Sequence, residues 1–389
     1  MTSVAAGYTP ALYIHIPWCL RKCPYCDFNS HLASSKIPES AYVQALLAEL
    51  EQHQQEFDIS EFSSVFFGGG TPSLFSPSAI AALLEGAHTR VGLATDAEIT
   101  LEANPGTSDY GRFRGYLDAG VNRLSIGVQS FNNQHLHALG RIHNAAEAQG
   151  AVVAAKAAGF SRLNLDLMYS LPGQTTEQCE ADLQQAIALS PSHLSLYQLS
   201  IEPHTHFHAY PPQLPTDDTV AAMEQQLRAT LHSVGYVRYE ISAYACPGQE
   251  CRHNLNYWQF GDYLGLGAGA HSKLTCGQTC HRIWNRKHPA DYLRQAGKGH
   301  VSSGRSQLGE VDLVAEFAIN TLRLTKGFSF REFTDRTGLP AHCLRIPVDK
   351  GLHKGWLQYD GQRVKATPTG YRFLNNVLEL FIAHPHGAA

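Results

Sequence analysis

The stretch LYIHIPWCLRKCPYCDFNSH, residues 12–31, decides how the fold of this chain is interpreted. It begins with LYIHI (12–16), a β-leaning run, and continues into a segment that holds three of the nine cysteines, Cys19, Cys23 and Cys26, in the spacing C-x3-C-x2-C. Three thiols this close together are typical of one loop that converges on a metal ion or a metal cluster. The stretch therefore predicts a strand followed by a thiolate metal site.

Two kinds of metal site are compatible with three thiols. A closed structural zinc site needs a fourth Cys or His ligand, and His15 and His31 are the candidates nearby. An iron–sulfur cluster held by only three thiolates keeps one iron open, and an open iron can bind a substrate. The loop follows the C-terminal end of a strand, where β/α barrels place their chemistry. Its position favours the cluster over zinc.

The composition indicates a globular protein of the cytoplasm. The chain has 389 residues, of which 43% are hydrophobic and 16% are charged. A net charge of −4 gives no electrostatic footprint for DNA or RNA, so we expect no nucleic-acid partner. Neither a signal peptide nor an apolar run of membrane-spanning length is recognisable. Without an export signal, the cysteines are interpreted as reduced thiols or metal ligands.

The first part of the chain alternates short β-leaning runs with stretches of helical spacing. This alternation is typical of parallel strands joined by crossover helices. Six such units are fewer than the eight of a complete barrel. We predict an α/β fold with an incomplete (β/α)6 barrel over residues 1–240, open on one side, in which helix 216–234 and the strand-like YVRYE (236–240) continue the barrel. The expected strands are LYIHI (12–16), SVFFG (64–68), EITLE (98–102), RLSIGV (123–128), RLNLDLM (162–168) and HLSLYQL (193–199).

The remainder of the chain has a different pattern. Residues 241–310 are rich in Gly, His and aromatic residues and show weak periodicity, so we interpret them as a connecting segment. Residues 311–389 are mainly helical, with a hairpin at WLQYDGQRVKAT (356–367) and a closing helix, TGYRFLNNVLELFI (369–382). Helices with one hairpin predict a small, winged-helix-like α+β domain.

The cysteine motif resembles the signature of the radical S-adenosylmethionine (SAM) superfamily. The resemblance rests on C-x3-C-x2-C after a first strand, with Tyr25 before the last cysteine. It implies that Cys19, Cys23 and Cys26 hold a [4Fe–4S] cluster, and that the amino and carboxylate groups of SAM chelate the fourth iron. In that superfamily, electron transfer cleaves SAM to a 5′-deoxyadenosyl radical. The resemblance thus explains why the run of thiols stops at three.

Further residues resemble one subfamily, the oxygen-independent coproporphyrinogen III oxidases (HemN) and the related haem chaperones (HemW). Tyr13, His15, Pro17 and GGGTP (68–72) carry this resemblance, which extends over nearly the whole chain. Two departures weaken the oxidase interpretation. The oxidases have a further cysteine two residues beyond the third cluster ligand, where this chain has Phe28, and they carry an N-terminal extension where only twelve residues precede Tyr13.

The same resemblance implies a set of SAM contacts. Glycine lets backbone groups approach a ligand closely, and the resemblance places the methionine amino group of SAM against GGGTP. It assigns the ribose to an acid at the end of the third strand and the adenine to the backbone of the aromatic residue beside the last cysteine. The implied SAM residues are Tyr13, Tyr25, Gly69, Gly70, Thr71, Glu102, Gln129, Arg141 and Asp166.

A second motif points to haem. RHNLNYW (252–258) resembles the HNxxYW motif of the haem chaperones. On a helix, His253 and Tyr257 lie one turn apart, and Asn254 and Trp258 widen that face. The resemblance implies that His253 is a ligand of haem iron and that the aromatic residues cover the macrocycle. The alternative is a histidine and two aromatic residues packed against the barrel.

Other groups of His and Cys are assigned no chemical role. EPHTHFH (202–208) is interpreted as a polar loop, although its histidines could bind a metal. CGQTCH (276–281) is expected to form a hairpin with reduced surface thiols. Cys179 and Cys343 fall in helical patterns and are expected to be packing residues.

The sequence therefore predicts a cytoplasmic haem chaperone that binds a [4Fe–4S] cluster, SAM and haem b. It would deliver haem to acceptors such as respiratory-chain enzymes. By resemblance, it would also form homodimers and contact the membrane peripherally, through its acceptors. The enzymatic alternative is oxidative decarboxylation of coproporphyrinogen III. A third interpretation, a structural zinc protein without redox chemistry, is favoured least.

Overall fold

One sheet organises most of the molecule. The computed structural model describes residues 9–33, 36–106 and 111–382. Within these residues a 12-stranded sheet has the order β14-β13-β12-β11-β1-β4-β5-β6-β7-β8-β10-β9. Its six central strands are parallel, which confirms the predicted (β/α)6 arrangement. They are β1 (Ala11–Ile16), β4 (Phe62–Gly69), β5 (Leu93–Ala103), β6 (Arg123–Gln129), β7 (Arg162–Tyr169) and β8 (His193–Gln198).

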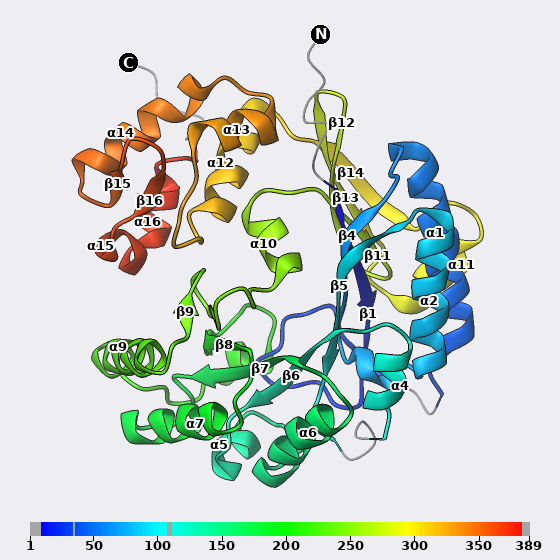
Figure 1. Ribbon diagram of the computed structural model, residues 1–389, viewed down its shortest axis with the longest axis horizontal. Helices are drawn as coiled ribbons and strands as arrows, with labels where there is room; N and C mark the ends of the chain where they lie inside the picture. The colour runs from blue at the N-terminus through cyan, green and yellow to red at the C-terminus, as the bar shows by residue number, and fades with distance from the viewer. Residues whose placement is uncertain (1–8, 34–35, 107–110, 383–389) are drawn as a thin grey trace.

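Crossover helices cover the outer face of these strands (Figure 1). Local capping starts several of them. The side chain of Ser76 accepts a hydrogen bond from the Ala79 amide, for example, and Thr175 forms a capping box with Gln178. The main helices are α1 (Glu39–Phe57), α2 (Pro77–Arg90), α4 (Phe113–Asp118), α6 (Ala145–Ala157), α7 (Thr176–Ala188) and α9 (Asp217–Ser233). Shorter elements are β2 (Trp18–Cys19), β3 (His31–Leu32), η1 (Pro72–Leu74), α5 (Asn133–Ala138) and α8 (His206–Ala209).

Alternation along the strands separates the core from the barrel interior. Leu12, Ile14 and Ile16 of β1 belong to the large apolar core beneath the helices. Tyr13 and His15 point the other way, because successive side chains of a strand face opposite sides of a sheet. The other parallel strands also direct polar residues inward, so polar side chains line the interior of the barrel.

Residues 237–310 extend this sheet at both ends. Strand β10 pairs antiparallel with β8, and β9 pairs with β10, so YVRYE continues the sheet as an antiparallel edge and not as a further parallel strand. Strand β11 pairs parallel with β1, and β12, β13 and β14 follow it antiparallel. The bounds are β9 (Val237–Arg238), β10 (Ala243–Ala245), α10 (Arg252–Trp258), β11 (Tyr263–Leu266), β12 (His271–Cys276), β13 (Thr279–Asn285), α11 (Pro289–Ala296) and β14 (Ser302–Gln307).

The C-terminal part has its own core. Phe317 makes edge-on ring contacts with Phe328 and Phe333, and Leu344, Val364 and Val377 belong to the same apolar cluster. This confirms the predicted small α+β domain and its hairpin. The elements are α12 (Glu310–Thr321), α13 (Phe330–Thr337), η2 (Ala341–Leu344), α14 (Arg345–His353), β15 (Leu357–Tyr359), β16 (Val364–Ala366), α15 (Pro368–Arg372) and α16 (Leu374–Glu379).

The closing helix differs from the prediction. The expected continuous helix is divided into α15 and α16 at Phe373, whose φ of −115° and ψ of 38° depart from helical values. Gly370 in α15 lies against the backbone of Trp356, where a Cβ atom would come within 1.9 Å of the carbonyl oxygen. No side chain fits at Gly370, so this position holds α15 against the segment that enters the hairpin.

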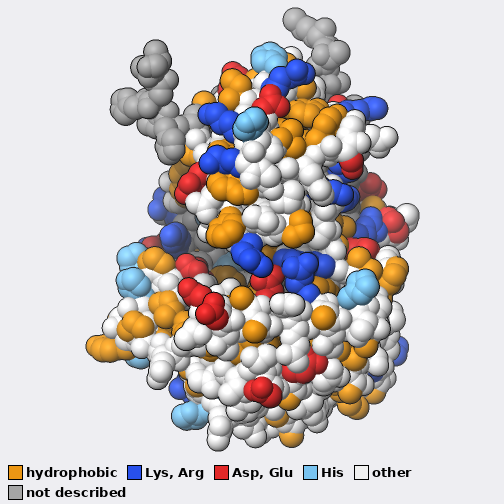
Figure 2. All heavy atoms as spheres, turned by 90° about the vertical axis from the view of Figure 1, so that its left-hand side faces the viewer, with side chains coloured by type: hydrophobic (Ala, Val, Ile, Leu, Met, Phe, Trp, Pro, Cys, Tyr) orange, Lys and Arg blue, Asp and Glu red, His pale blue; other side chains and the backbone are white. Residues whose placement is uncertain are grey.

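Ion pairs join the C-terminal part to the barrel. Arg323 pairs with Glu240 at 3.0 Å, and its guanidinium lies 4.2 Å from the ring centre of Trp258 in α10. Figure 2 shows the face that lies on the left in Figure 1, with Lys and Arg side chains mixed with Asp and Glu across its middle. Among the described helices, none is long and apolar enough to cross a bilayer.

Candidate functional site

The C-terminal ends of the parallel strands surround a cavity of about 470 Å³, which we call the first cavity. The loop after β1 and the ends of β4, β5, β6 and β7 bring together residues far apart in the sequence. Apart from Tyr13, every residue expected to bind the cluster or SAM lines it. These residues are Cys19, Cys23, Tyr25, Cys26, Gly69, Gly70, Thr71, Glu102, Gln129, Arg141 and Asp166.

Backbone and side-chain hydrogen bonds hold the cysteine loop over this cavity. The His31 amide donates to the Pro17 carbonyl at 2.7 Å, and the Ala33 amide donates to the Cys19 carbonyl at 2.8 Å. The Asn29 side chain donates to the Ala268 carbonyl at 2.8 Å, which ties the loop to the segment after β11. The loop is therefore fixed at both ends.

The three cysteines predicted to hold the cluster line the first cavity together. Cys19, Cys23 and Cys26 are free, partly exposed and turned to the same cavity. Yet among the described residues no three His, Cys, Asp or Glu side chains are grouped so that they could hold one metal ion. In a [4Fe–4S] cluster each thiolate binds a different iron, so the sulfur atoms lie farther apart than around one ion. His15 and His31 bond to Asn29 instead of joining the thiols.

The glycine motif brings the end of β4 against β1. Gly69 has a φ of 119°, and a Cβ atom there would come within 2.7 Å of the His15 ring. At Gly70, a Cβ atom would lie 2.5 Å from the Trp18 carbonyl oxygen. Side chains are therefore excluded at both positions, and backbone groups line the cavity.

Two partly exposed carboxyl groups, those of Glu102 and Asp166, line the first cavity. Burial, and then the neighbouring Asp166, raise the pKa of Glu102 to about 8. Its Oε2 accepts a hydrogen bond from the Gly69 amide at 3.2 Å. Burial also raises the pKa of Asp166, whose oxygens accept hydrogen bonds from Ser125 and Asn164. Such a pair favours a ligand that carries positive charge and hydroxyl groups.

A polar chain connects two of the thiols. Arg141 donates to the Cys23 sulfur at 3.6 Å and to Asn104 Oδ1 at 2.6 Å. Asn104 donates to the Thr71 hydroxyl at 2.9 Å, and that hydroxyl donates to the Cys19 sulfur at 3.6 Å. Asn104 was not predicted as a site residue, although it lies two positions beyond Glu102 in the same LEANPG stretch. The two-residue period of the strand could have identified it.

Tyr25 is held by an apolar cluster at the rim of the first cavity. Its ring lies 6.4 Å from that of Phe207, and the Phe207 amide donates to the Pro24 carbonyl at 3.0 Å. Phe207 belongs to EPHTHFH, where α8 forms. That stretch therefore supports the cysteine loop through its phenylalanine.

Gln129 ends β6 with a φ of 69°, in the left-handed region that residues other than glycine rarely adopt. A backbone outlier of this kind is stabilised by its surroundings and is frequent at functional sites. The position of Gln129 on the first cavity agrees with the predicted SAM contact, which remains a prediction.

A second cavity of about 440 Å³ adjoins the first, and both are lined by Phe28, Gly69 and Glu102. Tyr13 lines this second cavity, and its hydroxyl lies 2.9 Å from His15 Nδ1. The remaining lining is largely aromatic, from α10, β11 and the loop between them. It includes Tyr257, Trp258, Phe260 and Tyr263, with His271, Lys273 and Arg282 on β12 and β13.

The haem motif forms the predicted helix, α10, but His253 does not offer an open imidazole. Its side chain is 1% exposed and lies 5.0 Å from the Phe66 ring centre. Nδ1 is 3.0 Å from the Ser64 hydroxyl, and Nε2 is 2.9 Å from the Tyr257 hydroxyl. Burial lowers the pKa of His253 to about 3, so the ring is neutral. Tyr257 lines the second cavity whereas His253 does not, and ligation of haem iron by His253 stays a prediction.

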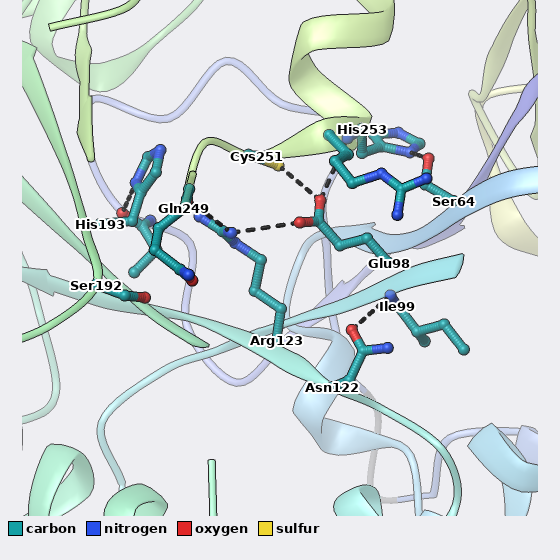
Figure 3. Close-up of polar contacts among 12 residues, drawn as sticks. Ser64, Glu98, Ile99, Asn122, Arg123, Ser192, His193, Gln249, Cys251 and His253 are labelled. Atoms are coloured by element: carbon teal, nitrogen blue, oxygen red, sulfur yellow. Dashed lines mark hydrogen bonds and ion pairs between the residues drawn. The ribbon is translucent and has the colours of Figure 1, made fainter. Parts of the chain in front are cut away.

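A buried ion pair fixes the start of α10, as Figure 3 shows. Arg123 Nη1 lies 3.3 Å from Glu98 Oε2 and donates to the Gln249 carbonyl. Glu98 Oε1 accepts from the His253 amide at 3.2 Å and from the Cys251 thiol at 3.4 Å. A carboxylate at a helix N-terminus satisfies amides that lack partners within the helix. The motif helix is therefore anchored at the N-terminal end of the barrel, away from the cysteines.

The remaining cysteines agree with their expected roles only in part. CGQTCH forms the predicted turn between β12 and β13, and Cys276 is exposed. Cys280 is buried instead of lying on the surface. Cys179 is buried in α7, where burial raises its pKa to about 12. None of these thiols faces the first cavity.

The barrel with three thiols at the end of its first strand defines the class of protein, the radical SAM proteins. Residues 13–186 match the model of the radical SAM superfamily, and residues 310–373 match that of the HemN C-terminal domain. Among solved structures, coproporphyrinogen III oxidase (HemN) from Escherichia coli superimposes with a TM-score of 0.82 at 23% identity. The superposition covers 98% of this chain and 91% of that one. This likeness shows the shared fold.

Curated relatives identify the family. The haem chaperone HemW of Haemophilus influenzae is 47% identical over 378 residues, with 96% of this chain and 97% of that protein covered. HemW of Escherichia coli is 46% identical, with 96% and 98% covered. The chain therefore belongs to the HemW family of the radical SAM superfamily.

Proposed function

We propose that this protein is a haem chaperone that binds a [4Fe–4S] cluster, SAM and haem b and delivers haem to acceptor proteins. The observation that carries the proposal is the full-length likeness to relatives named haem chaperone HemW. The aromatic second cavity beside the first supports it, because an apolar, flat macrocycle requires aromatic and aliphatic walls.

The residues of the first cavity are suited to the cluster and to SAM. Cys19, Cys23 and Cys26 would hold the cluster, which, when bound, supplies an open iron for the amino and carboxylate groups of SAM. Glu102 and Asp166 would accept hydrogen bonds from ligand hydroxyl or ammonium groups. The buried Nε of Arg141 has no hydrogen-bond partner among the described residues, so the cavity retains an unused donor.

The GGGTP backbone and the remaining predicted contacts complete the proposed SAM site. Gly69, Gly70 and Thr71 would present backbone groups to the methionine end, and Gln129 and the Tyr25 backbone would contact the nucleoside. Tyr13 would act from the second cavity, where its hydroxyl lies close to His15.

A chaperone is favoured over the oxidase by Phe28. This side chain is 63% exposed and stands between the two cavities, at the position where oxidases have a cysteine. An exposed aromatic ring at this boundary offers surface to a planar ligand. Of the HNxxYW motif, Tyr257 and Trp258 reach the same cavity and would contact the macrocycle.

We place the protein in the cytoplasm, since all nine cysteines are free, as expected in a reducing compartment. Respiratory-chain enzymes are the proposed acceptors. Because respiratory-chain enzymes lie in the membrane, the chaperone would contact the membrane peripherally. A homodimer would bring two haem-loaded chains to the membrane. Each of these partners follows from the proposed role in haem delivery.

Two parallel assays test the function. Anaerobically reconstituted protein is titrated with haem, and the same preparation is incubated with coproporphyrinogen III, SAM and a reductant. The proposal expects a saturable Soret band and no protoporphyrinogen. Conversion of coproporphyrinogen III without saturable haem binding would replace the chaperone by the oxidase.

A further inference from the structure

Both ring nitrogens of His253 are occupied by Ser64 and Tyr257, so in the observed arrangement a ligand of haem iron has to come from another residue of the second cavity. The histidines that line it are His15 and His271. His15 Nε2 donates to the Asn29 carbonyl at 2.9 Å, which leaves Nδ1 to accept from the Tyr13 hydroxyl, also at 2.9 Å. Both nitrogens of His15 are therefore occupied.

His271 has the properties that His253 lacks. Its side chain is exposed and lines the second cavity. Within the described part of the chain, neither of its ring nitrogens has a hydrogen-bond partner. An imidazole with a free nitrogen lone pair is the commonest metal ligand among side chains.

The sheet fixes the position of His271. It begins β12, where it pairs with Trp284 of β13. Strand β11 approaches so closely that a Cβ atom at Gly265 would lie 2.1 Å from the His271 carbonyl oxygen. A site on a strand holds its ligand more accurately than a site on a loop.

The surroundings of His271 suit a planar apolar ligand. Tyr257 and Tyr263 line the same cavity, with ring centres 4.4 Å apart and an interplanar angle of 85°. Phe28 enters from the cysteine loop and also borders the first cavity. A macrocycle at His271 would thus lie beside the SAM site.

We infer that His271 is the axial ligand of haem iron, and that Phe28, Tyr257 and Tyr263 contact the macrocycle. His253 is then a positioning residue, which holds Tyr257 at the cavity wall through the hydrogen bond between them. This inference rests on the proposed chaperone function and assigns the iron to a residue outside the HNxxYW motif. A ligand on the exposed side of the cavity also allows the haem to leave.

The test is an anaerobic haem titration of the cluster-loaded full chain and its variants, followed as difference spectra. His271→Ala should shift the Soret band and lower affinity at least about tenfold. Added imidazole should restore the band position, and His271→Cys should give a thiolate-type spectrum. His281→Ala is the matched control, since His281 is the neighbour of Arg282 in β13 and does not line the second cavity.

His253→Ala, with its fold checked by circular dichroism, should keep the Soret position of the parent. The inference is overturned if His271→Ala binds haem with unchanged spectrum and affinity. It is also overturned if His253→Ala alone loses the nitrogen-ligand spectrum. If the parent chain itself binds no haem, the proposed function fails together with the inference.

Discussion

Glu98 and Glu102 lie on the same strand and on the same inner face, yet their surroundings differ. Glu98, in the middle of β5, accepts hydrogen bonds from the His253 amide and the Cys251 thiol and pairs with Arg123. Glu102, at the end of β5, has the Gly69 amide as a partner and faces the first cavity. A glutamate at the N-terminal end of the barrel thus has its hydrogen bonds made within the protein, whereas a glutamate at the C-terminal end is available to a ligand.

This difference distinguishes a polar residue that stabilises the fold from one that is available to bind a ligand. A buried charge that is fully paired fixes neighbouring elements, here the start of α10. A carboxyl group that is shielded from water and has few hydrogen-bond partners has a raised pKa, and its oxygens stay available to a ligand. Variants at the two ends of the barrel should therefore affect different properties, stability at Glu98 and ligand binding at Glu102.

The largest expected effect is on the cysteine loop. Replacing Cys19, Cys23 or Cys26 with Ala should abolish the brown chromophore and the iron content of about four per chain expected for the cluster. Cys179→Ala and Cys343→Ala are the controls and should keep both. The measurement is iron and sulfide analysis after anaerobic purification, and zinc without iron or sulfide would refute the cluster.

The next largest effect concerns the buried ion pair between Arg123 and Glu98 at the N-terminal end of the barrel. Arg123→Met should lower the free energy of unfolding by about 3–5 kcal/mol, because it leaves Glu98 buried without its charge partner. Arg114→Met is the control, since Arg114 and Asp118 form an exposed pair and its loss should cost less than about 1 kcal/mol. Urea denaturation of both variants measures the difference. Equal losses would mean that the buried pair does not anchor the barrel.

The pH dependence of the free energy of unfolding should reveal the ionisation of Glu102, at the C-terminal end of the barrel. The folded-state pKa of Glu102 is raised to about 8 from its ordinary 4.5, so the folded protein holds a proton that the unfolded chain has lost. Its contribution to the free energy of unfolding is therefore present at low pH and is lost as pH rises from about 4.5 to about 8.

Glu102→Gln should reduce the change in the free energy of unfolding with pH, measured from denaturation curves recorded between about pH 5 and about pH 8. It should not abolish the slope, because burial raises the pKa of Glu49 to about 7 with the same sign. An unchanged slope in the variant would show that Glu102 ionises freely in the folded protein.

The smallest effect is on SAM affinity. Glu102→Ala, Asp166→Ala and Gln129→Ala should keep their iron yet bind SAM more weakly, by roughly 0.5–1.5 kcal/mol for each lost neutral hydrogen bond. Calorimetry on cluster-loaded protein measures this. Gln149→Ala is a matched control, because Gln149 bonds to Gln185 on the outer surface. Unchanged affinity in all three variants would mean that the SAM site lies elsewhere.

Much of the barrel was predictable because its strands follow local rules. The runs of the first half are apolar on the helix-covered face, and the cysteine spacing, GGGTP and LEANPG lie at strand ends where parallel strands converge. Together with the resemblance to the radical SAM superfamily, these features led to predicted cluster and SAM residues that line one cavity, with Tyr13 in the adjoining one.

The strands of residues 241–310 were harder to recognise. Lys273 of β12 and Arg282 of β13 line the second cavity instead of an apolar core, so the alternation of apolar and polar residues is weak. The burial of His253 was also hidden, because it depends on Ser64, 189 residues earlier in the chain. A motif shows which residues lie on one face of a helix, while only the tertiary structure shows what covers that face.

Haem transfer tests the central claim most directly. Cluster-loaded protein is charged with one equivalent of haem, separated from free haem and mixed anaerobically with a haem-free b-type respiratory enzyme. The acceptor's Soret band and the haem left on the chain are followed together. The account predicts that haem leaves the chain intact and appears in the acceptor faster than from free haem at the same concentration. Haem that stays on the chain, or reaches the acceptor no faster than free haem does, would contradict the assignment of a chaperone.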